Sequence, residues 1–234
     1  MKAATAPACI GLASAMLCSV LIAGERADLD GVWFLIEAHT PDDRHFTPAG
    51  QTYFESYDPL LDDPDTDCVP VSFTNIMHTP SPPFEIRQHA DHVEINYEFM
   101  DVRRRVPLDR SLTVATAPYT VASHPHLGRS VGRYEGESLV VDTAGQTAEV
   151  LDTFHVVGLP QSNRMRTEER FIPDGDDLEV VVTHNDPVNY TEPLVVTYRF
   201  HRLDSEILEW GCTLDGANYD ERLEESTRGG PTGP

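Results

Sequence analysis

The chain has 234 residues, of which 40% are hydrophobic and 8% aromatic, enough to build a substantial core. Its formal charge at pH 7 is −22, from 39 acidic side chains against 17 lysines and arginines. This charge argues against nucleic acid and anionic membrane surfaces as partners, because both require cationic patches on a protein.

The first segment, residues 1–24, is predicted to be a signal peptide. Lys2 precedes an apolar run rich in small residues from Ala8 to Gly24, and cleavage is expected after Ala23 or Gly24. No other segment approaches the length of a membrane span. We therefore expect an exported protein, secreted or periplasmic, without a membrane span.

Removal of this segment would leave Cys68 and Cys212 as the only cysteines. Two thiols in an oxidising compartment most simply form one disulfide, which would stabilise the fold by roughly 3–5 kcal/mol because it closes a long loop. The alternative, a catalytic cysteine, has no Cys/His signature to support it.

Residues 28–220 are expected to form one all-β domain. Eight short segments rich in β-branched and aromatic residues, each bounded by turn residues, predict antiparallel strands. In chain order the predicted strands are 30–38, 92–100, 102–108, 138–145, 165–172, 178–184, 194–202 and 206–214. Within 92–100, Val93, Ile95, Tyr97 and Phe99 share one face, as a half-buried strand requires. A barrel or a sandwich fits this pattern.

Three other segments also carry predictions. Residues 40–84 are rich in proline, with room for a short helix at Ala49–Ser56, and are either a disulfide-stapled surface excursion or a functional lid. The glycine-spaced run at 128–137 lacks the lysine of a phosphate-binding loop, and it predicts a hairpin that turns at Gly136. Residues 221–234 are expected to be a disordered tail.

Two resemblances refine the fold class. The sequence "DLDGVWFL", with Gly31 and Trp33, resembles the Gly-x-Trp opening of lipocalin-type barrels. That resemblance implies a tryptophan at one barrel end under an arginine of a late strand, here Arg199 or Arg202. The segments "YEFMDVRR", "GRSVGRYEGESLVVDT", "TEERF" and "DPVNYTEPLVV", with Asp63-Pro64 and Cys68-Val69-Pro70, resemble a large group of exported bacterial proteins without assigned activity. We therefore predict a single antiparallel eight-stranded, lipocalin-like barrel whose proline-rich segment covers one mouth.

The histidine pair His124 and His126 is the first candidate for chemistry. On an extended strand, residues i and i+2 face the same way and can supply two ligands to one metal ion. Pro125 between them favours a polar loop instead. His89 and His92, three residues apart in a turn, have still weaker support as metal ligands.

Charged and aromatic residues within the strands are the second group. An interior carboxylate with a raised pKa can move a proton, while arginine, tyrosine or histidine stabilises an oxyanion. The candidate catalytic residues are Tyr97, Glu98, Arg103, Glu169, Asp186 and Tyr190, and the candidate ligand-binding residues are Trp33, Phe99, His124 and His126. A buried Glu–Arg pair with a purely structural role is the competing interpretation.

The leading hypothesis is an exported enzyme that acts by acid–base chemistry, without a cofactor or metal, on a small apolar or aromatic molecule held in the barrel. An isomerase, a cyclase or a dehydratase-type lyase would fit. The alternatives are a non-catalytic carrier of such a ligand and a His-ligated metal enzyme.

Overall fold

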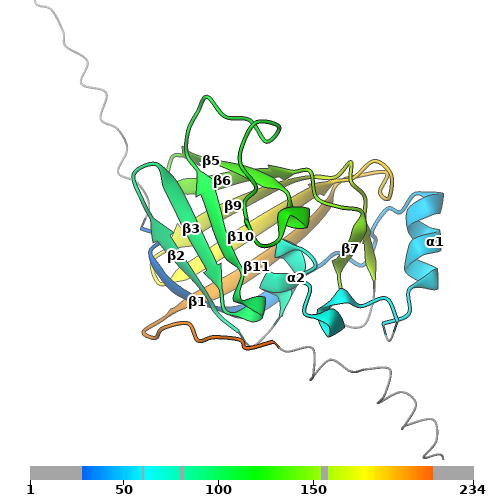
Figure 1. Ribbon diagram of the computed structural model, residues 1–234, viewed down its shortest axis with the longest axis horizontal. Coiled ribbons are helices and arrows are strands. Elements are labelled where there is room, and N and C mark those ends of the chain that lie inside the picture. The colour runs from blue at the N-terminus through cyan, green and yellow to red at the C-terminus, as the bar shows by residue number, and fades with distance from the viewer. Residues whose placement is uncertain (1–27, 60, 80–81, 154–157, 213–234) are drawn as a thin grey trace, which may run out of the picture.

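Nine antiparallel strands form the main sheet of the computed structural model, which describes residues 28–59, 61–79, 82–153 and 158–212 (Figure 1). The strands are β1 (Gly31–His39), β2 (Phe84–Gln88), β3 (His92–Tyr97), β4 (Arg103–Pro107), β5 (Arg129–Glu135), β6 (Ser138–Ala144), β9 (Arg166–Asp174), β10 (Asp177–Asn185) and β11 (Leu194–Leu203). Their order in the sheet is β4-β3-β2-β1-β11-β10-β9-β6-β5. A second, two-stranded sheet pairs β7 (Glu149–Asp152) with β8 (Leu159–Gln161).

The main sheet curls into a nearly closed barrel. Its two outer strands, β4 and β5, lie close together. A hydrogen bond that Arg104 of β4 donates to Ser130 of β5 shows this proximity. A Cβ atom at Gly132 of β5 would lie only 2.9 Å from a methyl group of Val106 of β4. Glycine at this position lets the two outer strands come this close.

The strand count corrects the predicted eight-stranded barrel to nine. Strand β2 has only five residues, and β5 carries two arginines and a glycine in place of a regular apolar alternation, so neither was among the eight predicted segments. The predicted hairpin is confirmed, since Glu135 pairs with Ser138 and Gly136 has a φ of +63°.

The predicted strand at 206–214 is wrong over the part that the structure describes. Residues 206–212 form no strand there, and the remaining two residues lie outside the described ranges. Two backbone amides of this segment donate hydrogen bonds to carboxylate side chains, and not to the backbone of a neighbouring strand. The Leu208 amide donates to Glu98, and the Trp210 amide donates to Asp101.

Alternation of apolar residues places the core inside the barrel. Every second residue of β10 and β11 is almost fully buried. These residues are Leu178, Val180, Val182 and His184 of β10 and Leu194, Val196, Tyr198 and Phe200 of β11. The predicted buried face is confirmed on β3 for Val93, Ile95 and Tyr97, while Phe99 is buried beyond the strand, in a 3-10 turn.

The proline-rich segment folds into three helices. They are α1 (Pro48–Ser56), the 3-10 helix η1 (Pro64–Asp67) and α2 (Phe73–His78), and two further 3-10 turns, η2 (Phe99–Asp101) and η3 (Pro125–Leu127), occur later in the chain. Thr47 caps α1 and Ser72 caps α2 through their hydroxyl groups. The helix predicted at Ala49–Ser56 is therefore confirmed.

Helix α2 is buried along its whole length and lies between the barrel and β7 (Figure 1). Inside the barrel, the Tyr198 hydroxyl donates to the Thr74 carbonyl at 3.2 Å. On the opposite side, the Ser72 hydroxyl donates to the Leu151 carbonyl of β7 at 2.5 Å. The end of the proline-rich segment is therefore packed inside the fold through α2, whereas in α1 only Gly50 is buried.

The packing of arginine over Trp33 is as the lipocalin resemblance implies. The guanidinium carbon of Arg202 lies 4.4 Å from the ring centre of Trp33. Arg202 also passes close to Gly31, where a Cβ atom would lie only 2.8 Å from its Nη1. Gly31 has a φ of +134°, so both the backbone angle and the space at this position favour glycine. Arg199, the other candidate, instead pairs with Glu37 on the outside.

Cys68 and Cys212 form the predicted disulfide. It joins the end of η1 to the segment that follows β11. The signal peptide at 1–24 and the tail at 221–234 lie outside the described residues. Within the described ranges, no helix has both the length and the apolar character of a membrane span.

Candidate functional site

A buried ion pair occupies the centre of the barrel. The guanidinium of Arg104, on β4, meets the carboxylate of Glu169, on β9, and their side chains are 0% and 1% exposed. Nη1 of Arg104 donates to Oε1 of Glu169 at 2.7 Å, and Nη2 donates to Oε2. Both carboxylate oxygens are therefore engaged by one planar fork.

The rest of the Arg104 side chain is also held. Nη2 donates to the hydroxyls of Ser130 and Thr143, at 3.2 and 3.1 Å, and Nη1 donates to the Tyr97 hydroxyl at 3.4 Å. The ring of Phe73, at the start of α2, covers the guanidinium at 3.7 Å. Burial acts to lower the pKa of Arg104, but the charge of Glu169 outweighs it and raises this pKa, so the guanidinium stays charged.

His184 lies between the barrel wall and α2. Its Nε2 is 2.9 Å from the Thr74 hydroxyl of α2, and its Nδ1 is 3.3 Å from the Thr167 hydroxyl of β9. Burial lowers the pKa of His184 to about 4, against the opposing charges of Asp152 and Asp186. The imidazole is therefore neutral at physiological pH.

A small chamber lies beside this contact, lined by residues of α2 and of the barrel wall. Its apolar lining consists of Phe73, Leu127, Leu151, Met165 and Val182, and its polar lining includes Thr74, Gln146, Gln161, Thr167, Glu169 and His184. The remaining space is about 10 Å³, room for about one water molecule. The Oε1 atoms of Gln146 and Gln161 are buried without a hydrogen-bond partner in the described part of the chain.

The depressed pKa of His184 predicts acid sensitivity. Above pH 6.5 this histidine is neutral in the folded and in the unfolded chain, so its full contribution to stability is present. Between pH 6.5 and about 4 the unfolded chain binds a proton that the folded chain does not, and the free energy of unfolding falls as the pH falls. The expected loss is about 3 kcal/mol at the acid end of this window.

Denaturant unfolding of the wild type and of His184→Gln across this pH window measures the effect. All other titrating groups are common to both proteins, so the difference between the two curves reports His184. The wild type should lose more stability than the variant on acidification. Parallel pH dependence in the two proteins would show that His184 does not titrate in this way.

Only two of the six predicted catalytic residues meet in the barrel, Tyr97 and Glu169. Glu98 follows the last residue of β3, at the start of the turn η2, and its side chain accepts a hydrogen bond from the Leu208 amide at 2.7 Å. The Arg103 side chain is 47% exposed and donates to the Tyr97 carbonyl. Arg103 lies on the outside, because its neighbour Arg104 on β4 is buried and neighbours along a strand face opposite sides.

Asp186 and Tyr190 belong to the loop between β10 and β11. Asp186 accepts hydrogen bonds from the amide and hydroxyl of Ser162, at 2.7 and 2.6 Å, and from the Asn189 side chain at 2.8 Å. The Tyr190 hydroxyl donates to the Pro160 carbonyl, and its ring stacks on Phe46. Both side chains hold the loop in place beside an open cleft of about 670 Å³ that lies outside the barrel.

The predicted ligand-binding residues do not converge on the chamber. Trp33 donates from its ring nitrogen to the Leu29 carbonyl, and Phe99 packs edge-on against Trp210. Nε2 of His126 donates a hydrogen bond to the Pro70 carbonyl at 2.8 Å. The His126 ring packs edge-on against the ring of His124. Within the described residues, no third ligand joins His124 and His126 to form a metal site.

Arg104 and His184 are not among the predicted site residues, although a pattern in the sequence identifies both. Arg104 falls on the same strand face as Val102 and Val106, which are fully buried. His184 continues the buried face of Val180 and Val182. A charged or titratable residue in phase with buried valines must point into the barrel.

Comparison with known proteins gives only remote similarity. No protein-family model matches the chain, and no curated protein matches it. Among solved structures it is similar to "REP1-NXSQ fatty acid transporter", with 13% identity over 76% of this chain and 98% of that chain and a TM-score of 0.38. It is also similar to the fluorescent protein UnaG, with 14% identity over 74% of this chain and 96% of that chain and a TM-score of 0.38. Lipid binding protein 8 of Caenorhabditis elegans has 9% identity, a TM-score of 0.37 and coverage of 74% of this chain and 94% of that chain. At these TM-scores the similarity carries no functional conclusion, so the function has to rest on the site itself.

Proposed function

We propose that this protein is a non-catalytic carrier of one small amphipathic molecule, bound in the barrel between α2 and the wall formed by Glu169 and His184. The observation that supports this proposal most is the chamber lining. Five apolar side chains line it, and two of its lining residues, Gln146 and Gln161, have Oε1 atoms that are buried without a donor among the described residues. A ligand with an apolar body and an N–H or O–H group would satisfy both properties.

The contacts of the interior carboxylate favour binding over proton transfer. Both oxygens of Glu169 already accept hydrogen bonds from Arg104, so the carboxylate would have to leave this pair before it could take a substrate proton. His184 is flanked by two hydroxyls and has a pKa far below neutrality. These contacts suit a recognition surface better than a general base, whose pKa should lie near the working pH.

In this proposal α2 is the movable part of the site. The space of about 10 Å³ holds no organic ligand, so binding requires α2 to withdraw Phe73 from the guanidinium of Arg104. Helix α2 has only six residues and belongs to no sheet, so it can move without breaking the strand ladder. The proposal includes export through the predicted signal peptide at residues 1–24.

Fluorescence titration with N-phenyl-1-naphthylamine, a neutral apolar probe with one N–H donor, tests the proposal. Phe73→Ala enlarges the chamber and should tighten one-to-one probe binding by at least about tenfold. Val182→Phe fills the chamber and should abolish binding. Phe54→Ala, a change on α1 outside the chamber, is the matched control and should leave the affinity unchanged.

Circular dichroism of each variant establishes that it is folded before the titration is interpreted. Saturable binding that is insensitive to Phe73→Ala and Val182→Phe would place the ligand elsewhere and overturn the proposal. Absence of saturable binding in the folded Phe73→Ala variant would do so as well.

A further inference from the structure

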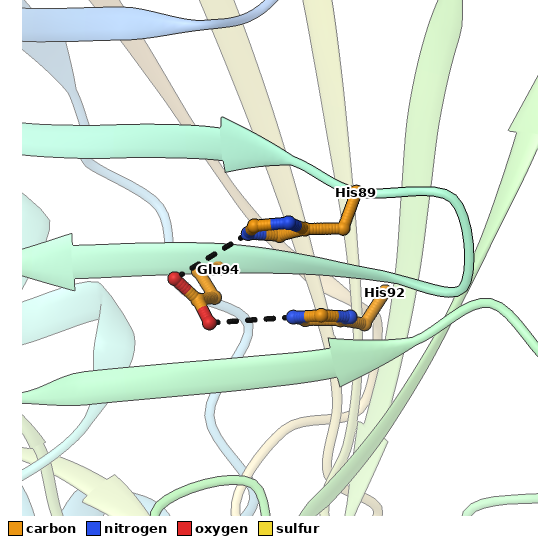
Figure 2. Close-up of side chains that lie close together, drawn as sticks. All are labelled: His89, His92 and Glu94. Carbon is orange, nitrogen blue, oxygen red and sulfur yellow. Dashed lines mark hydrogen bonds and ion pairs between the residues drawn. The ribbon is translucent and has the colours of Figure 1, made fainter.

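The hairpin between β2 and β3 gathers three side chains that can ligate a metal ion (Figure 2). His89 follows the last residue of β2, while His92 and Glu94 lie on β3. The His89 amide donates to the His92 carbonyl at 2.9 Å, which closes the turn. All three residues therefore come from one short, hydrogen-bonded element outside the barrel.

The spacing of the three side chains fits a bound cation. Nε2 of His89 lies 3.5 Å from one carboxylate oxygen of Glu94, and Nε2 of His92 lies 3.3 Å from the other. Both distances exceed those of ordinary N–H···O hydrogen bonds. Two ligands of a tetrahedral ion with bonds of about 2.05 Å are separated by about 3.3 Å, which is close to both values.

Asp91 prepares His92 for this role. Its carboxylate lies 2.7 Å from Nδ1 of His92, so the ring proton belongs on Nδ1 and the lone pair on Nε2. A carboxylate behind a histidine ligand is the usual arrangement in metalloproteins, because it fixes the tautomer and makes the ligand more basic. Arg105 uses the same lone pair, since its Nη1 lies 2.7 Å from Nε2.

From this geometry we propose that His89, His92 and Glu94 bind a divalent transition-metal ion of the zinc class, with water completing the coordination. Two imidazoles and one carboxylate suit such ions better than Ca²⁺ or Mg²⁺, which prefer oxygen ligands. The site lies on the outside of the barrel, so the proposal does not depend on the interior chamber.

Two movements accompany binding. The imidazole rings are now stacked, with centres 4.2 Å apart and planes 8° apart, and they must tilt so that both lone pairs converge on one ion. Arg105 must leave His92. Its side chain is 56% exposed and already lies 3.6 Å from Asp91, which offers it another ion-pair partner.

Calorimetric titration of the untagged, chelator-treated chain with ZnCl₂ near neutral pH tests the site. We expect one ion per chain, with His89→Ala and His92→Ala each weakening the affinity by at least about tenfold. Asp91→Asn should also weaken it, because it removes the negative charge behind His92. Co²⁺ in place of Zn²⁺ should show the visible absorption of a four-coordinate site, and the two alanine variants should lose it.

The matched control is His201→Ala, which removes an exposed histidine that lies 2.8 Å from Asp177. It should leave the Zn²⁺ affinity unchanged. Arg105→Gln should strengthen binding, because it removes the cation that competes for Nε2. Absence of saturable Zn²⁺ binding, or equal affinity in the wild type and both alanine variants, would overturn the proposal.

Discussion

Glu169→Gln is expected to destabilise the fold by about 3–5 kcal/mol, because it leaves the charge of Arg104 buried without its counter-ion. The Arg104 side chain is 0% exposed in the folded barrel, so water does not take the place of the lost counter-ion there. Ser130, Thr143 and Tyr97 would still accept its hydrogen bonds, but none of them carries a charge. The free energy of unfolding from denaturant titration measures this loss.

Two comparisons separate the loss of charge pairing from the loss of packing. The double variant Arg104→Met with Glu169→Met removes both charges and should be more stable than Glu169→Gln, since apolar residues can replace a buried pair at small cost. Glu37→Gln breaks the exposed pair with Arg199 and should cost less than about 1 kcal/mol. Equal losses at Glu37 and Glu169 would show that burial does not strengthen the interior pair.

Loss of the disulfide is expected to lower the free energy of unfolding by an amount similar to that expected for Glu169→Gln. Cys68 and Cys212 are separated by 144 positions, and the chain-entropy model gives about 5 kcal/mol for a closed loop of this length. The double variant Cys68→Ser with Cys212→Ser should therefore unfold at a clearly lower denaturant concentration than the oxidised wild type.

The reduced wild type is the control for this measurement. Cys68 has a φ of +59°, so a substitution there acts on a strained backbone as well as on the disulfide. Reduction breaks the bond and leaves the cysteine in place. If reduction leaves the unfolding midpoint unchanged, the disulfide does not stabilise the folded chain.

The strands that could be predicted from the sequence are those with regular alternation. β10 and β11 carry an apolar residue at every second position, and the structure buries these residues inside the barrel. β5 is predicted only as one arm of the hairpin at Gly136, because Arg129, Gly132 and Arg133 break its alternation. Its place is fixed by pairing with β6 and by the close approach of Val106 to Gly132.

The candidate site depends on contacts that no local pattern contains. Glu169 was selected from the sequence, but its partner Arg104 lies 65 positions earlier, within a run of three arginines. Glu98 falls within the predicted strand 92–100, but β3 ends at Tyr97 and Glu98 already has the helical backbone angles that lead into η2. The chamber itself exists because α2 enters the barrel mouth, and the proline-rich segment around α2 has no periodicity that predicts this position.

The place of β11 in the sheet has a consequence for the order of folding. It is the last strand of the barrel in the chain, and its two neighbours are β10 and β1, the first strand. During synthesis, β1 to β4 and β5 to β10 can form as two separate groups of strands, each with an open edge. The barrel closes only when residues 194–203 are available to join them, and a closure between distant parts of a chain is a slow step. Until then β1 and β10 remain exposed strand edges, the part of an unfinished sheet most prone to pair with other chains.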